Sequence, residues 1–178
     1  MEVKLIDHMG SDLTVVNAAR VSFDKVSDWE EETDGPIIDY LKFEDEKLIR
    51  YLAKHNHWTP FGHCSLQFHI TAPIFVARQL GKHQVGLVWN EVSRRYVDSK
   101  PEFFDPLLFR SRADWKKQGS MPDAVIEYNM KPLIEYVTQC YENMLSKGIC
   151  PEQARMVLPQ AMYTEWYWSG SLAAFARV

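Results

Sequence analysis

Eight consecutive residues from Cys64 to Thr71 alternate between apolar and polar side chains. A repeat of two residues is the period of a β-strand that is buried on one face only. The segment therefore predicts a strand that needs a core against its apolar face, and it directs the Cys64 thiol into that core. The apolar face consists of Cys64, Leu66, Phe68 and Ile70, and the polar face of Ser65, Gln67, His69 and Thr71.

Helices are predicted on both sides of this strand. The segment from Asp45 to His55 places apolar residues at intervals of three or four, which predicts an amphipathic helix. Its Glu46 stands four residues before Arg50, the spacing of an exposed ion pair. After the strand, Pro73 suits the first turn of another helix, because an N–H at that position has no helical partner. That helix runs through Ala77, Arg78 and Gln79 and ends at Gly81.

The remaining elements are predicted by the same criteria. Apolar residues recur at helical spacing from Ile126 to Met144, where Pro132 kinks or restarts the helix and Gly148 stops it. A shorter helix is predicted from Pro151 to Leu158. The other predicted elements are two short strands, Val3 to Leu5 and Leu13 to Val16, and an acidic loop from Ser27 to Pro36.

Composition indicates one globular domain over residues 1–178, with 46% hydrophobic and 25% charged residues. The formal net charge of -4 argues against a duplex nucleic-acid partner. The three cysteines lack a C-x-x-C spacing, so neither a disulfide framework nor a four-thiolate zinc site is predicted. No apolar run approaches the roughly 20 residues of a membrane span, and the first residues do not resemble a signal peptide. We therefore expect a cytoplasmic protein without membrane contact.

The stretch from Arg78 to Tyr96 gathers arginine and lysine side chains with a histidine, two glutamines, an asparagine, a carboxylate and a serine. Within it, the run from Asn90 to Arg95 can accept hydrogen bonds from a base or sugar and donate them to phosphate. A guanidinium group matches two phosphate oxygens at once. The stretch therefore predicts a site for a small phosphorylated ligand.

Histidines cluster at His55, His57 and His63, next to Cys64. They superficially offer metal ligands, but the thiol faces the core and no complete ligand set falls at a familiar spacing. We expect no metal, and we interpret Cys64 as a core cysteine rather than a nucleophile.

Two other patterns have two interpretations each. The aromatic run from Trp166 to Trp168 either stacks on an aromatic ligand or fills a core or subunit interface, and the second interpretation is favoured. Arg155 lies among apolar residues, where its charge needs either a bound anion or a salt bridge to a local glutamate. The residues themselves leave both explanations of Arg155 open.

Four blocks follow one another along the chain: Thr59-Pro60-Phe61-x-His63, Ala72 to Gln79, Asn90-Glu91-x-Ser93-x-Arg95-Tyr96, and Ala154-Arg155-x-Val157-Leu158-Pro159 with Tyr163-Thr164. Together they resemble the flavin-dependent thymidylate synthases, the ThyX family. The resemblance implies an enzyme of the α/β (α+β) class, with a central antiparallel sheet, flanking helices, and active sites shared within a homotetramer. The family methylates dUMP to dTMP with methylenetetrahydrofolate as carbon donor, while NADPH reduces FAD, the hydride source. No cysteine attacks the uracil in this family.

Matching positions carry the family's contacts onto this chain. Ser93, Arg95 and Arg155 would be the catalytic residues, with Arg155 reaching in from a neighbouring subunit. The dUMP contacts implied are Gln79, Glu91, Ser93, Arg94, Arg95 and Arg155. The flavin or folate contacts implied are Ser22, His57, Thr59, Lys82, His83, Gln84, Asn90 and Glu91.

The chain departs from the family pattern in two places. Where the family has Arg-His-Arg and seven residues before a serine, this chain has Lys82-His83-Gln84 and eight residues before Ser93. The loss of two guanidinium groups weakens the expected flavin contacts. Relatives also continue beyond Val178, so we expect the family's C-terminal segment to be lacking. These departures keep two alternatives open: a flavin-dependent pyrimidine nucleotide hydroxymethylase, and a non-catalytic nucleotide-binding paralogue.

Overall fold

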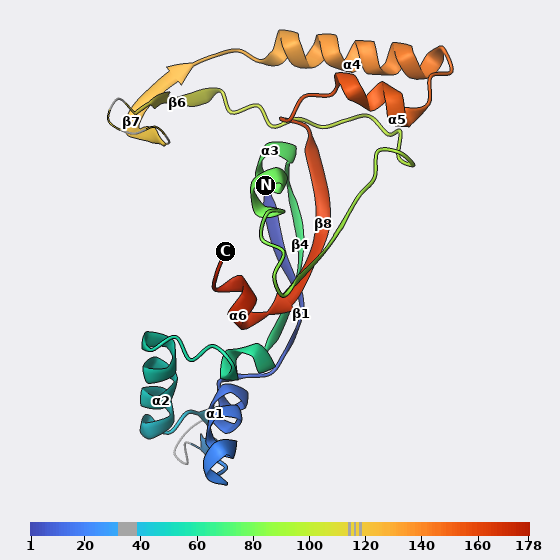
Figure 1. Cartoon of the computed structure of the whole chain (residues 1–178). Coiled ribbons are helices and arrows are strands. Elements are labelled where there is room, and N and C mark those ends of the chain that lie inside the picture. Colours follow the sequence, from blue (N-terminus) through green and yellow to red (C-terminus); the bar gives the residue numbers. More distant parts are fainter. Residues whose placement is uncertain (32–38, 114, 116, 118) are drawn as a thin grey trace. The chain divides into compact units, whose positions relative to one another are not determined.

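The computed structural model describes residues 1–31, 39–113, 115, 117 and 119–178 (Figure 1). The contacts divide the chain into two compact units. Unit 1 consists of Met1–Ile70, Leu80–Glu91 and Trp166–Val178, and unit 2 of Thr71–Gln79 and Val92–Glu165. Within the described residues, no helix is both long enough and apolar enough to cross a membrane.

A four-stranded sheet has the order β1-β4-β8-β5. Strands β5 and β8 pair antiparallel, with Trp89 opposite Trp168 and Glu91 opposite Trp166. The sheet and its helices confirm the predicted fold class. The strand predicted from Cys64 to Thr71 and the strand predicted from Val3 to Leu5 are also confirmed. The bounds are β1 Glu2–Met9, β4 Ser65–Pro73, β5 Leu87–Glu91 and β8 Tyr163–Ser171.

Strand β8 shows why the sheet holds together. Trp166 and Trp168 are 1% and 4% exposed, while Tyr167 between them is 47% exposed. Successive side chains point to opposite faces, so the two indoles share the buried face. The Trp89 ring stacks on Trp166 with centroids 4.3 Å apart. The core interpretation of Trp166 and Trp168 is therefore confirmed.

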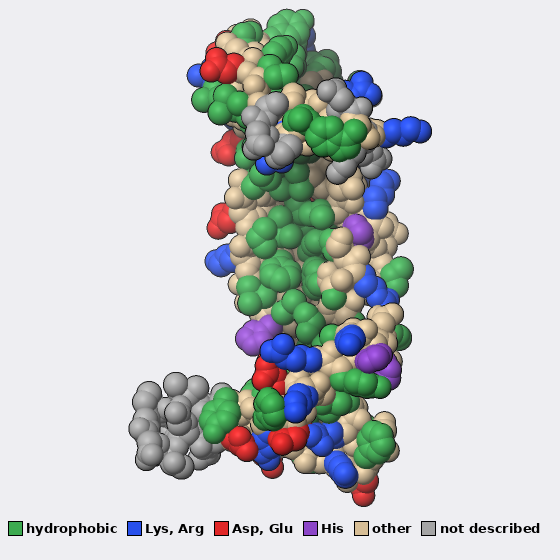
Figure 2. All heavy atoms as spheres, turned by 90° about the vertical axis from the view of Figure 1, so that its left-hand side faces the viewer, with side chains coloured by type: hydrophobic (Ala, Val, Ile, Leu, Met, Phe, Trp, Pro, Cys, Tyr) green, Lys and Arg blue, Asp and Glu red, His purple; other side chains and the backbone are tan. Residues whose placement is uncertain are grey.

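Strand β1 lies at an edge of this sheet, and all eight of its residues are exposed. Its sequence is nevertheless apolar at several positions, including Val3, Leu5 and Met9, which are 66%, 49% and 62% exposed. Figure 2 likewise shows a broad area of hydrophobic side chains on the face that it presents.

The helices of unit 1 pack around a small core of Val15, Leu52 and Cys64. Helix α2 confirms the predicted amphipathic helix, and Arg50 Nη2 lies 2.6 Å from Glu46 Oε1, as the spacing predicts. The bounds are α1 Asp12–Arg20, α2 Phe43–Lys54 and α6 Leu172–Phe175, with 3₁₀ turns at Val21–Phe23 and Pro60–His63 and a small hairpin of β2 Glu30–Glu31 and β3 Asp39–Tyr40.

The predicted strand from Leu13 to Val16 is wrong, because these residues lie inside α1. The Ser11 N–H donates to Thr14 Oγ1 at 3.0 Å and stabilises the start of the helix. Val15 and Ala19 both pack on the core, four residues apart. Helical packing therefore outweighs the strand preference of the paired valines.

Unit 2 contains most of α3, a hairpin, α4 and α5. Helix α3 confirms the prediction after Pro73, and α5 with the following 3₁₀ turn confirms the helix predicted from Pro151. The bounds are α3 Ile74–Leu80, β6 Leu108–Arg112, β7 Ser120–Glu127, α4 Lys131–Ser146, α5 Pro151–Ala154 and the 3₁₀ turn Arg155–Val157.

Two predicted boundaries are corrected. Ile126 belongs to β7 rather than to the start of a helix, and Pro132 lies in the first turn of α4, where it causes no kink. The acidic segment from Ser27 contains the strand residues Glu30 and Glu31, and residues 32–36 lie outside the described part of the chain.

Gly10 offers a test of the contact between β1 and the core. Its φ is +89°, and a Cβ added there would lie 2.8 Å from Cys64 Sγ. We expect Gly10→Ala to lower the free energy of unfolding by about 1 to 3 kcal/mol more than Gly148→Ala does. Gly148 is the matched control, because its φ is +79° and an added Cβ would meet nothing within 4 Å. Urea denaturation measures both, and equal losses would contradict the close approach.

Candidate functional site

The turn after β5 carries the central residues of the predicted nucleotide site. The N–H groups of Tyr96 and Val97 donate to the Ser93 carbonyl at 3.0 and 3.1 Å, which closes the turn. Arg95 donates to Ser93 Oγ through both its backbone N–H and its Nε, at 3.3 Å each. The Arg95 guanidinium lies 5.1 Å from the Tyr96 ring centroid. The structure therefore brings Ser93 and Arg95 together on one exposed turn of unit 2.

Arg94 points elsewhere. Its Nη1 donates to the Ser99 carbonyl, and the side chain is only partly exposed. It lines a cavity of unit 2 together with Thr71 and Lys100. Adjacent arginines thus have different surroundings, and Arg95 has the more accessible guanidinium.

The other residues of the predicted nucleotide site are exposed and dispersed along the chain. Gln79 lies near the end of α3, and Arg155 begins the 3₁₀ turn that follows α5. The expected apolar surroundings of Arg155 are wrong, because this side chain is exposed and its neighbour Met156 is 76% exposed. Arg155 Nε donates to the Glu152 carbonyl at 3.3 Å. Within the described residues Arg155 forms no ion pair, so the local salt bridge is absent there.

Asn90 and Glu91 lie next to each other on β5 and therefore point to opposite faces of the sheet. Asn90 pairs with Tyr167, and Glu91 with Trp166. Glu91 Oε2 accepts a hydrogen bond from Trp89 Nε1 at 3.3 Å. The exposed Glu91 carboxylate is thereby tied to the aromatic cluster of unit 1.

The Lys82-His83-Gln84 segment forms the turn between α3 and β5. His83 N donates to the Leu80 carbonyl at 3.0 Å, and Leu87 N donates to the Gln84 carbonyl at 3.2 Å. Gly86 has a φ of +75°, which a glycine adopts without strain. Lys82 and Gln84 are exposed, and His83 is half-buried.

His57 and Thr59 follow α2 in an exposed loop of unit 1. His57 lines a cavity of about 250 Å³ between this loop and α6. The rings of His55 and His57 have centroids 6.5 Å apart, with Tyr51 beside both. Among the described residues, no group of three or more His, Cys, Asp or Glu side chains could hold a metal ion.

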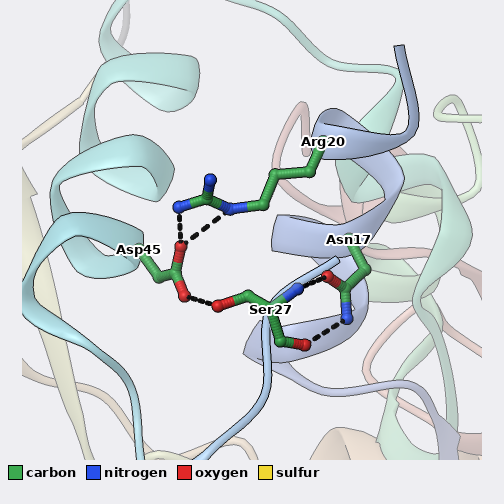
Figure 3. A network of polar contacts seen from close by, with 4 residues as sticks. All are labelled: Asn17, Arg20, Ser27 and Asp45. Atoms are coloured by element: carbon green, nitrogen blue, oxygen red, sulfur yellow. Dashed lines mark hydrogen bonds and ion pairs between the residues drawn. The ribbon is translucent and has the colours of Figure 1, made fainter. Parts of the chain in front are cut away.

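Ser22 lies on a turn that is fixed by a buried polar network (Figure 3). Arg20 Nε donates to Asp45 at 2.9 Å, and the Ser27 hydroxyl donates to the other carboxylate oxygen. Ser27 also exchanges two hydrogen bonds with Asn17, at 2.7 and 3.0 Å. The network joins both ends of the turn to α1 and α2.

Asp45 is fully buried, and its pKa reflects opposing causes. Burial raises the pKa, but hydrogen bonds from Ser27 and Arg20, with the charges of Arg20 and Lys42, lower it by more. The pKa of Asp45 therefore lies below its ordinary value, and the carboxylate is ionised at neutral pH.

Cys64 has the opposite environment. Burial, followed by the charge of Asp12, raises the pKa of the Cys64 thiol. The thiol donates a hydrogen bond to the Ser11 carbonyl at 3.5 Å. A raised pKa disfavours the nucleophilic thiolate. The interpretation of Cys64 as a core cysteine is therefore confirmed.

Several of these residues escaped sequence reasoning. Arg20 and Asp45 are 25 residues apart, and no local spacing joins them. Trp58 and Arg177, which also line the cavity beside His57, are separated by most of the chain. Only the placement of Trp58 between His57 and Thr59 hinted at its involvement.

A flavin-dependent thymidylate synthase of Thermus thermophilus is 41% identical over 174 residues, which cover 96% of this chain and 59% of that protein. The corresponding protein of Thermosipho africanus is 38% identical over 94% of this chain and 70% of its own length. The crystal structure of the UMP/dUMP methylase PolB from Streptomyces cacaoi, bound with 5-Br dUMP, aligns with a TM-score of 0.75. That alignment has 32% identity and covers 97% of this chain and 74% of PolB.

The chain thus spans about three fifths of the length of the Thermus relative. Residues 4–178 match the thymidylate synthase complementing protein family, Thy1. This match extends over the turn with Ser93 and Arg95, the loop with His57, and the helical segment with Arg155. The predicted resemblance to flavin-dependent thymidylate synthases is therefore confirmed, and the chain belongs to the thymidylate synthase complementing protein family.

Proposed function

We propose that this chain belongs to a flavin-dependent thymidylate synthase that methylates dUMP to dTMP. In this proposal methylenetetrahydrofolate donates the carbon and NADPH reduces the FAD. The observation that supports this proposal most strongly is the turn in which Ser93, Arg95 and Tyr96 are held together by hydrogen bonds and a cation–π contact. The PolB structure, bound with 5-Br dUMP, supports a pyrimidine nucleotide as the substrate class.

The turn would bind the nucleotide through its phosphate. An exposed guanidinium with one edge fixed by Ser93 retains donors for phosphate oxygens, and its fixed direction lowers the entropy lost on binding. Ser93 and Arg95 would then orient the uracil for reaction. No step requires a protein thiolate, in keeping with the buried Cys64.

The cavity beside His57 fits part of a flavin. Its walls combine apolar side chains with Asn56, His57 and an arginine, which suits a planar aromatic ring with a polar edge. When bound, FAD would supply the hydride for the methylation. The residues of this chain proposed to hold it are Ser22, His57, Thr59, Lys82, His83, Gln84, Asn90 and Glu91.

A homotetramer with shared active sites completes the proposal. Arg155 is exposed and would reach the nucleotide of a neighbouring subunit. The apolar residues of β1 remain uncovered within the described part of one chain, which supports burial against another copy. We propose that the protein acts in the cytoplasm.

The visible absorption spectrum of the full chain with FAD, recorded before and after addition of dUMP, tests this function. We expect a protein-bound flavin spectrum that shifts when dUMP is added. Reduction with NADPH, followed by dUMP and methylenetetrahydrofolate, should yield dTMP, and the product mass separates it from a hydroxymethylated nucleotide. A chain that binds no flavin would contradict the proposal.

UMP is the competing substrate, because the similar PolB is described as acting on both UMP and dUMP. The two nucleotides differ only in the 2′-hydroxyl. Competition of UMP against dUMP in the flavin absorption assay measures the preference of the site between the two nucleotides.

Arg95→Ala is expected to weaken dUMP binding by about 2 kcal/mol or more, because it removes a charge-assisted contact to phosphate. Isothermal titration of wild type and variant measures this loss. Arg110→Ala is the control, since Arg110 is another exposed arginine of unit 2, on β6. Unchanged affinity in Arg95→Ala would remove this side chain from the site.

A further inference from the structure

The turn proposed to bind the nucleotide lies in a loop, residues 93–101, whose two ends are attached to the first residues of β8. Just before the loop, Val92 N donates to the Glu165 carbonyl at 3.0 Å. Just after it, Tyr163 N donates to the Glu102 carbonyl at 2.8 Å. Backbone hydrogen bonds therefore fix the ends of the loop, while its middle lies outside the sheet.

Little packs against the middle of this loop. Every residue from 95 to 100 is exposed. A cavity of about 260 Å³ lies between the loop and the neighbouring strands, because loop residues such as Arg94 and Ser99 line it together with Thr71 and residues 162–165. A segment with solvent and a cavity around it gains little order from side-chain packing. Hydrogen bonds within the loop must therefore set its conformation.

Arg94 is a side chain that reaches across the loop. Its Nη1 donates to the carbonyl of Ser99, five residues further along the chain. This hydrogen bond spans the tighter turn in which Tyr96 N and Val97 N donate to the Ser93 carbonyl at 3.0 and 3.1 Å. Among the described residues Arg94 has no carboxylate partner. The guanidinium therefore uses its charge in a charge-assisted bond to the backbone.

The same turn directs the side chain of Arg95. Arg95 donates to Ser93 Oγ through its backbone N–H and its Nε, at 3.3 Å each. Both distances exceed the usual range for N–H···O bonds, so these two bonds alone fix the guanidinium weakly. Arg94 lies between these residues, and its bond to Ser99 restricts the backbone that carries them.

We propose that Arg94 is a positioning residue, which holds the turn in its binding conformation through the Ser99 carbonyl and does not touch the nucleotide. This inference rests on the proposed function. The family resemblance implies a dUMP contact for Arg94, whereas the guanidinium lies against the loop itself. A loop that is ordered beforehand loses less entropy when a ligand binds. Arg94 thereby raises the affinity of Ser93 and Arg95 for the nucleotide without adding a contact.

Arg94→Met tests the proposal, because methionine keeps an unbranched side chain and removes every donor. We expect the dissociation constant of dUMP, from isothermal titration of the full chain, to rise about tenfold, in line with one lost hydrogen bond from a charged group. In the chain without dUMP, hydrogen exchange of the Tyr96 and Val97 amides should become about tenfold faster, because the turn opens more often. Arg94→Lys keeps a charged donor and should restore part of both values.

A double-mutant cycle separates positioning from direct contact. If Arg94 acts through Arg95, Arg94→Met should weaken dUMP binding by less than about twofold in a chain that already carries Arg95→Ala. Two independent phosphate contacts would give additive losses instead. Arg110→Met is the control, because Arg110 is an exposed arginine of unit 2 outside this loop, and both dUMP affinity and amide exchange should stay unchanged.

Three results would overturn the inference while wild type still binds dUMP. Unchanged affinity in Arg94→Met would show that the turn does not need this hydrogen bond. Weaker binding with unchanged amide exchange, or additive losses in the cycle, would make Arg94 a direct ligand. Faster exchange with full affinity would show that order in the turn does not limit binding. Failure of the proposed function differs from all three, because the wild-type chain itself would then bind no dUMP.

Discussion

Replacement of Asp45 with alanine should lower the free energy of unfolding by about 3 to 5 kcal/mol, the range for breaking a buried ion pair on one side. Asp45 is fully buried and accepts hydrogen bonds from Arg20 and Ser27 (Figure 3). The variant leaves the Arg20 guanidinium and the Ser27 hydroxyl without their acceptor. Urea denaturation of both proteins at pH 7 measures the difference.

The adjacent Glu46 is the control for this loss. Glu46→Ala breaks the exposed ion pair with Arg50 on the same helix, and we expect a loss of about 0.5 kcal/mol. Comparable losses in the two variants would show that burial adds nothing to the Asp45 network.

The stabilisation from Asp45 also depends on pH. The pKa of this carboxyl is lower in the folded chain than its ordinary value of 3.8, so the unfolded chain takes up the proton first as the pH falls. The stabilisation from the ionised Asp45 carboxylate is therefore complete when the pH is above the ordinary pKa of the group. It is lost as the pH falls through the pKa of Asp45 in the folded chain. Asp45→Asn should show a smaller decrease in stability than wild type across this acidic range. An equal decrease would mean that the pKa of Asp45 is not lowered by folding.

Trp166→Ala should lower the free energy of unfolding by a similar amount, about 3 to 5 kcal/mol. The indole is 1% exposed and stacks on Trp89 with ring planes 17° apart. Within the described residues its Nε1 has no hydrogen-bond partner, so the expected loss comes from apolar burial and from the cavity left behind.

Tyr167 provides a control one residue away on the same strand. It is 47% exposed, and its ring contacts His69 at a centroid distance of 5.0 Å on the opposite face of β8. Tyr167→Ala should change stability by about 1 kcal/mol or less. A larger loss for Tyr167 than for Trp166, measured by thermal and urea unfolding, would contradict the assignment of the two faces.

Elements with one clear period were predictable from the sequence. Strand β4 and helix α2 each show a single repeat over eight or more residues, and both elements form where the repeat predicts. Helix α2 buries the predicted face, whereas both faces of β4 are half-buried from Ser65 to His69, so the predicted burial of one face only is wrong for this strand. The errors occurred where two tendencies compete. The valines of α1 favour a strand locally, yet Ser11 and the core contacts of Val15 select a helix. The helical spacing of apolar residues extended N-terminally to Ile126, although pairing between β6 and β7 places Ile126 in a strand.

Some features of the candidate site were likewise predictable from the sequence, and others were not. The turn with Ser93 and Arg95 was predictable because its charged and hydroxyl residues are consecutive, and a short turn keeps consecutive residues close. Arg155 is exposed because little packs against the short 3₁₀ turn that contains it. Its apolar neighbours along the chain gave no indication of this exposure. The Asp45 network and the cation–π contact between Arg177 and Trp58 join residues distant in sequence, and only the tertiary fold brings such residues into contact.

The exposed apolar edge strand β1 has a consequence for the newly made chain. An uncovered edge carries backbone donors and acceptors that can pair with any extended segment, and the valine, leucine and methionine side chains of β1 strengthen such pairing. A folded single chain with this edge uncovered therefore presents a template for aggregation. Precipitation during refolding should increase with protein concentration, because pairing between such edges is intermolecular.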